Sequence, residues 1–324
     1  MIFLSYVGSF PLRRSYANIM QCTEDVLLIP VDYPNYIQLV DMIDQYLAPM
    51  ANSGMGLSLE SGKYFMKGDT IKFPEAFDNE SLRILVELRN KEPYRNNIKG
   101  IKACVTGPFT LSSRILLRTR NPGIFGETAL SNPSIVESLS NIVAKFAKYY
   151  QDLGADCIMI EEPILSVIVG KKILLNQYKN NDLINILDNT LNMVNCLKGI
   201  HVCGRISRTL SEILLSTNIR ILDHEFKDSN DNFNIYSKKD IESSAKKINL
   251  GVVSSKTLRV ESIEEIIAVI RKGIDVFGKE NIFMIKPDCG FRGLDPDGDF
   301  EGVAYRATID KIRNIRSALD SFQK

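Results

Sequence analysis

The chain alternates short apolar segments with longer amphipathic ones over its whole length. The short segments are rich in β-branched and other apolar residues, which is typical of buried strands. The longer segments repeat apolar residues every three or four positions, which is typical of helices packed on one face. We predict strands near residues 3–7, 56–59, 101–105, 157–160, 199–202, 220–224, 250–253 and 282–285. We predict helices near residues 36–46, 81–90, 133–153, 183–197, 208–216, 238–248, 262–277 and 300–322.

This alternation predicts a parallel sheet whose right-handed connections pass through helices. Eight such units can close into a TIM (β/α)8 barrel, and an open doubly wound sheet is the alternative. The open sheet usually carries a Gly-rich phosphate-binding turn after its first strand, whereas residues 7–11 read Val-Gly-Ser-Phe-Pro. Because no Ser/Gly-rich linker interrupts the pattern, we predict an α/β fold in which residues 1–324 form a single TIM-barrel domain.

Composition and charge narrow the classes of protein. The sequence is 44% hydrophobic and 24% charged, which excludes a disordered or collagen-like chain. Forty basic residues against 39 acidic ones give a net charge of +1, so no overall field favours nucleic acid or anionic lipid. The start of the chain does not resemble a secretory signal, and no uncharged stretch reaches the roughly 18 residues of a membrane span. We expect a cytoplasmic protein whose partners are neither nucleic acid nor membrane.

Candidate metal ligands lie at the ends of predicted strands. His201 and Cys203 end the fifth strand, Glu225 follows the sixth, and Cys289 follows the eighth. In a barrel these carboxyl ends share one mouth, and residues two apart on a strand point to the same face. Two thiolates, one imidazole and one carboxylate suit tetrahedral zinc at the C-terminal face of the barrel. A buried cysteine is more often a small core residue, so spacing alone leaves two interpretations open, a zinc ligand or a core residue.

Six motifs occur in an order that resembles the catalytic half of the cobalamin-independent methionine synthases, especially the short archaeal type with one barrel. The motifs are Val-Gly-Ser-Phe-Pro at 7–11, Thr-Gly-Pro-Phe-Thr-Leu at 106–111, Ile-Glu-Glu-Pro-Ile-Leu at 160–165, His-Val-Cys at 201–203, Leu-Gly-Val-Val at 250–253 with Val-Glu-Ser at 260–262, and Pro-Asp-Cys-Gly at 287–290. The resemblance spans nearly the whole chain.

The resemblance implies a zinc-dependent methyltransferase that methylates the thiol of homocysteine to form methionine. His201, Cys203, Glu225 and Cys289 correspond to the family's zinc ligands. Zinc explains the chemistry, because a free thiol is mostly protonated at neutral pH whereas a zinc-bound thiol is a nucleophilic thiolate.

Two further positions match the residues that hold the amino-acid substrate. Ser9 corresponds to the residue at the substrate carboxylate, and Glu161 to the residue at its ammonium group. Glu161 is thus a candidate for both substrate binding and catalysis. It stands where the family usually has Asp, so a shifted or different acceptor thiol stays open.

Three departures from the family concern the methyl donor. Arg114 stands where folate-using members stack a Trp on the pterin, and the chain contains no Trp. The acidic segment expected at residues 55–65 is not recognisable, and Lys256 replaces a catalytic His. We therefore assign Arg114 to cofactor binding and Lys256 to catalysis.

A cobalt leaving group needs no proton, whereas a folate nitrogen does. These departures favour methylcobalamin or a methylated corrinoid over methyltetrahydrofolate, and they suggest a corrinoid protein as partner. The cations near predicted strand ends that could contact such a partner are Arg13, Arg14, Arg114, Arg118, Arg205 and Lys256.

Three alternative functions stay open on the sequence. The barrel could transfer a methyl or alkyl group to another thiol such as coenzyme M. A decarboxylase of the uroporphyrinogen type shares the barrel and needs no zinc. A non-catalytic barrel subunit could keep a degenerate site.

Overall fold

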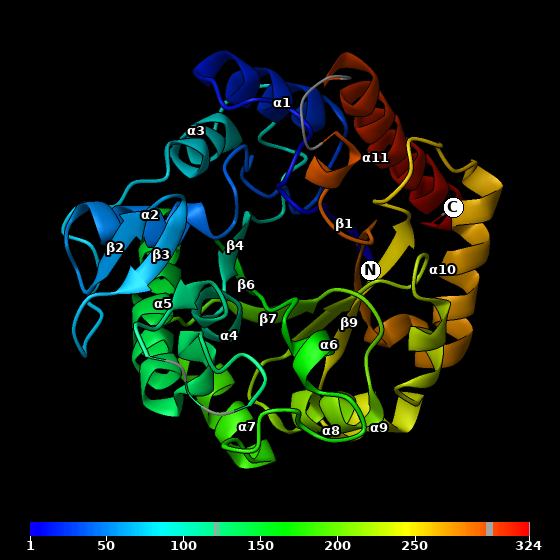
Figure 1. Ribbon diagram of the computed structural model, residues 1–324. Coiled ribbons are helices and arrows are strands. Elements are labelled where there is room, and N and C mark those ends of the chain that lie inside the picture. Colours follow the sequence, from blue (N-terminus) through cyan, green and yellow to red (C-terminus); the bar gives the residue numbers. More distant parts are fainter. Residues whose placement is uncertain (120, 122, 296–300, 324) are drawn as a thin grey trace.

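The computed structural model describes residues 1–119, 121, 123–295 and 301–323. Seven parallel strands form a curled sheet in the order β1-β10-β9-β8-β7-β6-β4. Figure 1 shows the strands around a central axis with the helices outside them. The strands are β1 Phe3–Leu4, β4 Lys102–Thr106, β6 Cys157–Glu161, β7 Leu197–Val202, β8 Ile221–His224, β9 Lys247–Val253 and β10 Ile282–Pro287.

An extended segment, residues 33–38, lies between the two edge strands β1 and β4. Isolated parallel bridges join Tyr33 to Ser5 and Asn35 to Lys102. The segment therefore runs along both edges of the curled sheet, in the place where a further barrel strand would stand.

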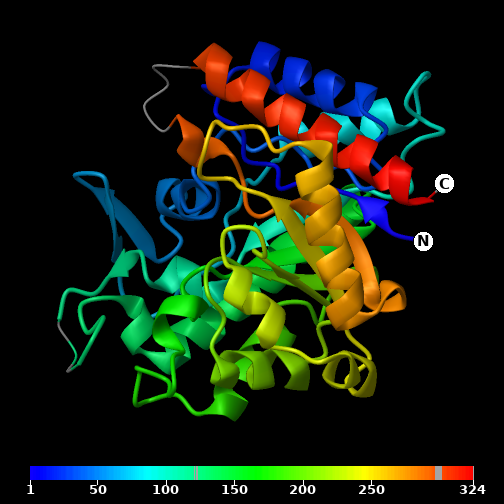
Figure 2. The same cartoon turned by 90° about the vertical axis from the view of Figure 1, so that its right-hand side faces the viewer.

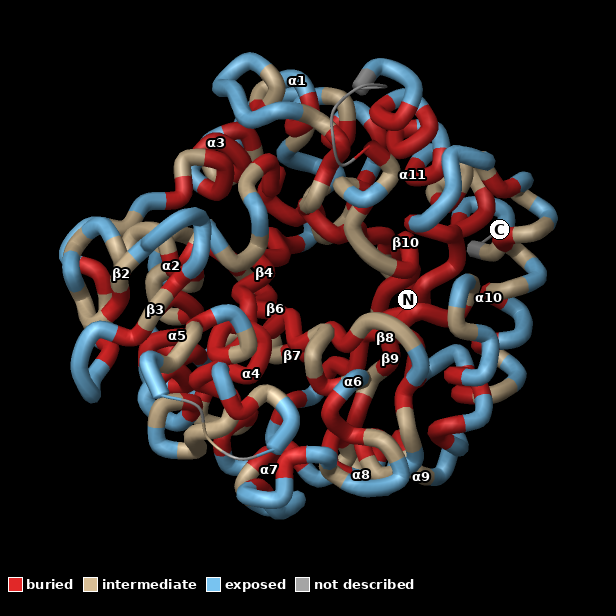
Figure 3. The backbone as a smooth tube through the Cα atoms, viewed as in Figure 1, coloured by how far each residue is buried: buried red, intermediate tan, exposed pale blue. Residues whose placement is uncertain are grey.

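Helices surround the sheet, and their apolar sides face inward. Figure 3 shows the inner ring of the chain buried and the outer surfaces of the helices exposed. None of the helices in the described ranges is long and apolar enough to span a membrane. The helices are α1 Tyr16–Leu28, α2 Asp44–Asn52, α3 Glu80–Arg89, α4 Pro108–Ser112, α5 Pro133–Leu153, α6 Leu165–Ile168, α7 Asn180–Asn189, α8 Arg208–Ser216, α9 Lys238–Ser243, α10 Ile263–Phe277 and α11 Glu301–Gln323.

The longest helix before α11 illustrates how the sequence sets these elements. The side chain of Asn132 accepts the backbone N–H of Ser134, and Pro133 occupies the first turn of α5. Both features favour a helix start. Gly154 ends α5 with φ +116°, a conformation that favours glycine.

A small side sheet stands beside the strand ends. β2 Leu57–Glu60 and β3 Lys63–Met66 form an antiparallel hairpin, and β5 Ile115–Leu116 pairs parallel with β3. Figure 2 shows this hairpin projecting from the side of the molecule that lies away from the N-terminus.

Of the predicted α/β TIM barrel, the α/β class is confirmed and the structure shows a curled parallel sheet, in which β1, β4 and β6 to β10 match predicted strands. The strand predicted at 56–59 is wrong as a barrel strand, because those residues belong to the hairpin. The helix predicted at 36–46 is wrong over residues 36–43, because α2 begins only at Asp44, and α1 was missed. Apolar residues at 36, 37, 40 and 43 imitate helical spacing. The predicted helix start at Phe300 lies outside the described residues.

The turn after β4 is fastened by the carboxylate of Glu162. This carboxylate accepts the backbone N–H of Phe109 (2.9 Å), and it accepts both the N–H (2.8 Å) and the hydroxyl (2.6 Å) of Thr110. Burial raises the pKa of Glu162 to about 7, and these hydrogen bonds oppose the rise. A Cβ on Gly107 would lie 2.2 Å from Oε1 of Glu162, so space rather than φ requires glycine there.

We expect Gly107→Ala to lower the free energy of unfolding by about 1–3 kcal/mol, because the new methyl group must displace a buried, hydrogen-bonded carboxylate. Urea unfolding measures the change. Gly170→Ala is the matched control, since the nearest atom to a Cβ there is 3.9 Å away. Equal stability of the two variants would contradict this account of the turn.

Candidate metal and substrate site

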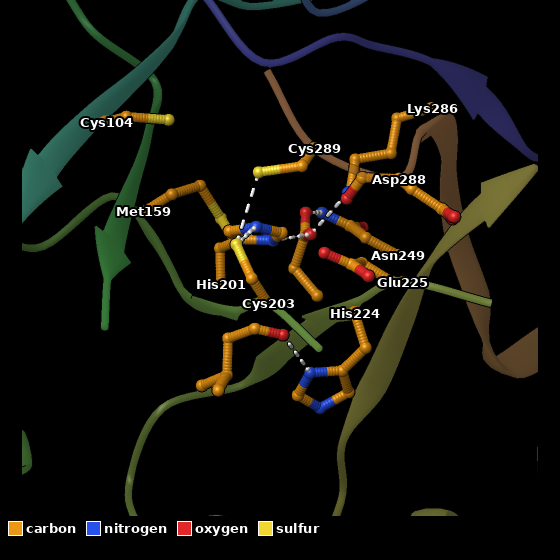
Figure 4. A network of polar contacts seen from close by, with 12 residues as sticks. Cys104, Met159, His201, Cys203, His224, Glu225, Asn249, Lys286, Asp288 and Cys289 are labelled. Carbon is orange, nitrogen blue, oxygen red and sulfur yellow. Dashed lines mark hydrogen bonds and ion pairs between the residues drawn. The ribbon is translucent and has the colours of Figure 1, made fainter. Parts of the chain in front are cut away.

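Three predicted zinc ligands meet at the carboxyl ends of β7 and β10. Nε2 of His201 lies 2.9 Å from Sγ of Cys203, and Sγ of Cys203 lies 3.2 Å from Sγ of Cys289. One ligand atom from each residue falls within 4.8 Å of the others. Figure 4 shows the three side chains pointing toward one another. The structure thus brings together residues that are 86 positions apart in the sequence.

A second carboxylate fastens the loop that carries Cys289. Asp288 accepts backbone N–H groups from the loop after β8, those of Phe226 (2.9 Å), Lys227 (3.1 Å) and Asp228 (2.5 Å). Consecutive N–H groups of this kind form a concave site for an anion. The contact ties the end of β10 to the end of β8 and thereby fixes Cys289 above the sheet.

Glu225, the fourth predicted ligand, is held by a neighbouring cation. Its Oε2 accepts from Nζ of Lys256 (2.9 Å) and from the hydroxyl of Ser229 (3.2 Å). Burial raises the pKa of Glu225, but Lys256 outweighs burial and the pKa is lowered. In the structure Glu225 groups with Asp228 and Asp288, and not with His201, Cys203 and Cys289. Lys256, predicted as catalytic, therefore contacts a predicted ligand.

His201 is oriented by a buried carboxylate. Its Nδ1 lies 2.6 Å from Oδ1 of Asp223, and Asp223 also pairs with Nζ of Lys286 at 2.8 Å. Burial and Lys286 lower the pKa of His201, but Asp223 raises it more, to about 10. A hydrogen bond from Cys203 lowers the pKa of the Cys289 thiol despite its burial, so Cys289 is the more acidic thiol of the pair.

This donor set fits zinc. With Nδ1 engaged by Asp223, the imidazole presents Nε2 to the two sulfur atoms, and a carboxylate–histidine pair of this kind commonly supports zinc sites. One nitrogen, two sulfurs and an adjacent carboxylate match the ligand preferences of zinc.

The second histidine of the chain has a different role. His224 is buried, with Nδ1 3.2 Å from the carbonyl oxygen of Val202 and Nε2 3.2 Å from the hydroxyl of Tyr236. Burial lowers the pKa of His224 to about 4, so the ring is neutral at physiological pH. Alternation along β8 turns His224 away from the cluster, as Figure 4 shows.

Both predicted substrate-binding residues lie at the same mouth. Ser9 packs against the loop of Cys289, since its carbonyl oxygen accepts the N–H of Phe291 at 2.8 Å. Glu161 ends β6 and pairs in register with His201. Burial raises the pKa of Glu161, and His201 opposes that rise only in part.

Arg114 lines a separate cavity of about 450 Å³ below the side hairpin. In this cavity the hydroxyl of Tyr64 donates to Oδ1 of Asp44 at 2.7 Å. Two other cations of the predicted basic rim are engaged within the chain: Arg118 with Glu60 and the ring of Phe65, and Arg205 with Asp231. The cavity is lined by Asp41, Ile43, Asp44, Gly62, Lys63, Tyr64, Ser113, Arg114 and Leu116.

Sequence reasoning missed the residues beneath the metal cluster. Asp223 precedes Glu225 by two positions and therefore shares its face of the strand, a signal that was available. Lys286 stands in an apolar strand, and a charged residue there is rare unless it is paired.

The chain is similar to proteins named methionine synthase. It is 31% identical over 218 residues to the methionine synthase of Methanothermobacter thermautotrophicus. The aligned segment covers 67% of this chain and 62% of that relative. The chain is 30% identical over 229 residues to the methionine synthase of Methanocaldococcus jannaschii, covering 66% of each. The matched segments thus span less than two thirds of either relative. The fold resembles that of a B12-independent methionine synthase from a Shewanella species, with a TM-score of 0.71, 14% identity, and coverage of 100% of this chain and 98% of that one.

The family described as cobalamin-independent synthase, catalytic domain, matches residues 94–304. This finding corrects the prediction about the donor. The predictions of methylcobalamin or a methylated corrinoid as donor, and of a corrinoid protein as partner, were wrong, because the family is named for its independence of cobalamin. With this motif order, this fold and this family match over most of its length, the chain belongs to the cobalamin-independent synthases.

Proposed function

We propose that this chain is a zinc-dependent methyltransferase that converts homocysteine to methionine. The observation that carries the proposal is the convergence of His201, Cys203 and Cys289 beside Glu225 at one mouth. The relatives are named methionine synthase, which supports homocysteine as the methyl acceptor. We further infer that residues 1–324 form one closed (β/α)8 barrel, with residues 33–38 as its second strand and the zinc site at the C-terminal face.

The four residues would hold zinc, and zinc bound there would keep the homocysteine thiol as a thiolate. Glu161, a buried carboxylate level with His201, would pair with the substrate ammonium group. Ser9, which packs on the Cys289 loop, would bind the substrate carboxylate. These contacts would align the thiol with the donor methyl group, because methyl transfer requires an in-line approach.

The donor that fits the cobalamin-independent family is methyltetrahydrofolate. The cavity below the hairpin contains an aromatic ring, Tyr64, and a guanidinium, Arg114, and both can stack on a flat ring system. Asp41 and Asp44 line the same cavity and would supply carboxylates in place of the acidic segment that is not recognisable at residues 55–65. Lys256 stays a candidate for catalysis. Its ion pair with Glu225 would have to open before the Glu225 carboxylate could bind the metal.

The decisive test is methionine formation by the zinc-loaded chain from homocysteine and 5-methyltetrahydrofolate. We expect about one zinc per chain and steady turnover. Cys289→Ser should lose most of its zinc and form no methionine, because it removes the more acidic thiolate of the pair. Cys196→Ser, at a half-buried thiol outside the cluster, should behave like the parent. Full zinc content in Cys289→Ser would refute the assignment.

Glu161→Gln should raise KM for homocysteine about 10- to 100-fold, because the amide cannot form an ion pair with the ammonium group. Its zinc content should equal that of the parent, since Glu161 is not among the proposed ligands. 2-Mercaptoethanesulfonate, a thiol without an ammonium group, is the control acceptor and should react equally with both proteins. Loss of zinc from the variant would instead place Glu161 at the metal.

Lys256→Met should strengthen zinc binding by up to about fivefold. The ammonium competes with a metal for the same oxygen of Glu225, and a half-exposed ion pair contributes about 0.2–1 kcal/mol. Competition with a chromophoric chelator measures the zinc affinity. Arg205→Met, which removes an exposed cation paired with Asp231, serves as control. Weaker zinc binding in Lys256→Met would argue against Glu225 as a ligand.

A further inference from the structure

Asp223 is the centre of a buried polar network that joins four strands. Oδ1 receives Nδ1–H of His201 (2.6 Å) and Nζ of Lys286 (2.8 Å), and Oδ2 receives Nδ2 of Asn249 (2.9 Å). The side chains of Asp223 and Lys286 are 2% and 0% exposed. Three donors around one fully enclosed carboxylate leave it little freedom to rotate, so the direction of its bond to His201 is fixed.

Lys286 connects this carboxylate to the loop that bears the second thiol. Its Nζ also donates to the carbonyl oxygens of Pro287 (2.9 Å) and Asp288 (2.7 Å), the two residues before Cys289. The same ammonium group therefore holds Asp223, which orients His201, and the backbone that positions Cys289. Two ligands from distant strands are set by one buried cation.

The side-chain amide of Asn249 is oriented so that it donates a hydrogen bond to Asp223. Its amide nitrogen donates to Asp223, while its amide oxygen has no hydrogen-bond partner among the residues described. The opposite orientation of the amide would place an oxygen against a carboxylate, which is repulsive. Asn249 on β9 and Lys286 on β10 thus both donate to the carboxylate of Asp223 on β8.

We propose that Asp223 and Lys286 are positioning residues that set the geometry and the tautomer of His201 for metal binding. The proposal rests on the zinc site proposed above. The pair is not required merely to fill the barrel, because two apolar or neutral groups of similar volume would do that without the cost of burying charge. Its specific contribution is an imidazole whose Nδ1–H is engaged and whose Nε2 faces the sulfur atoms.

The test is the zinc affinity of Asp223→Asn/Lys286→Met, measured by chelator competition. The double variant removes both charges and leaves no unpaired buried ion, so it should lose less stability than Asp223→Asn alone, even though the carbonyl oxygens of Pro287 and Asp288 lose a donor. We expect its zinc affinity to fall about 10- to 100-fold, the range for outer partners of ligating histidines. Asp223→Asn alone should lose both stability and zinc affinity. Parent-like zinc affinity in the double variant would overturn the proposal.

The matched control is Glu261→Gln/Lys311→Met, which neutralises an equally buried pair with a 2.7 Å separation outside the cluster. Its zinc affinity should equal that of the parent, and an equal loss in both double variants would overturn a specific role for Asp223. A parent chain that binds no zinc would refute the proposed function itself, so the two failures are distinguishable.

A spectroscopic readout separates positioning from stability. The chain has two histidines, so 15N-labelled imidazoles give two resolvable sets of signals. In the zinc-loaded double variant the Nδ1–H signal of His201 should shift by more than the signals of His224, whose Nδ1 lies against the carbonyl oxygen of Val202 rather than against Asp223. If the double variant is unfolded, Asn249→Ser decides: it should weaken zinc binding and shift the same signal, and an unchanged affinity and signal would overturn the proposal.

Discussion

One line of residues across the parallel sheet sets the positions of the functional groups. Thr106, Glu161, His201, Asp223 and Asn249 stand at the same level on β4, β6, β7, β8 and β9. Side chains at one level of a parallel sheet are neighbours when they share a face. A slip of one residue in any of these strands would turn its member toward the helices. The register therefore decides which carboxylates, those of Glu161 and Asp223, stand on either side of His201.

This register also concentrates charge on a part of the curled sheet that is closed to solvent. Asp223 and Lys286 pair there, and breaking such a pair leaves an uncompensated buried charge, so the network resists rearrangement. Beneath it, burial raises the pKa of Cys104 and of Cys157, the latter to about 12, so both remain thiols. The pKa of Cys289 is lowered instead. The interior thus separates inert thiols from the pair that can bind metal.

The ends of the strands could be predicted, because buried parallel strands appear in the sequence as short apolar runs. Since all of these strands run in the same direction, their ends place His201, Cys203 and Cys289 at one edge of the sheet. Residues 33–38 could not be placed, since their pairing consists of isolated bridges and their spacing imitates a helix. The pairing of Lys256 with Glu225 was also hidden, because it joins two loops across 31 residues. The sequence shows which face of its own strand a residue occupies, because side chains alternate along a strand. Contacts between loops cannot be predicted in this way, because they depend on how all the strands are arranged.

The error about the donor has the same origin. Considered singly, positions 114 and 256 depart from the family pattern, and the absence of Trp suggests that a surface for the donor is missing. In the structure, β3 pairs with β5 so that Tyr64 stands beside Ile115, the residue after Arg114. A ring and a guanidinium from segments 50 residues apart in sequence therefore line one cavity, with carboxylates from a third segment. A flat ring system can be held by such a composite wall, so the absence of one aromatic residue does not decide which donor the barrel binds.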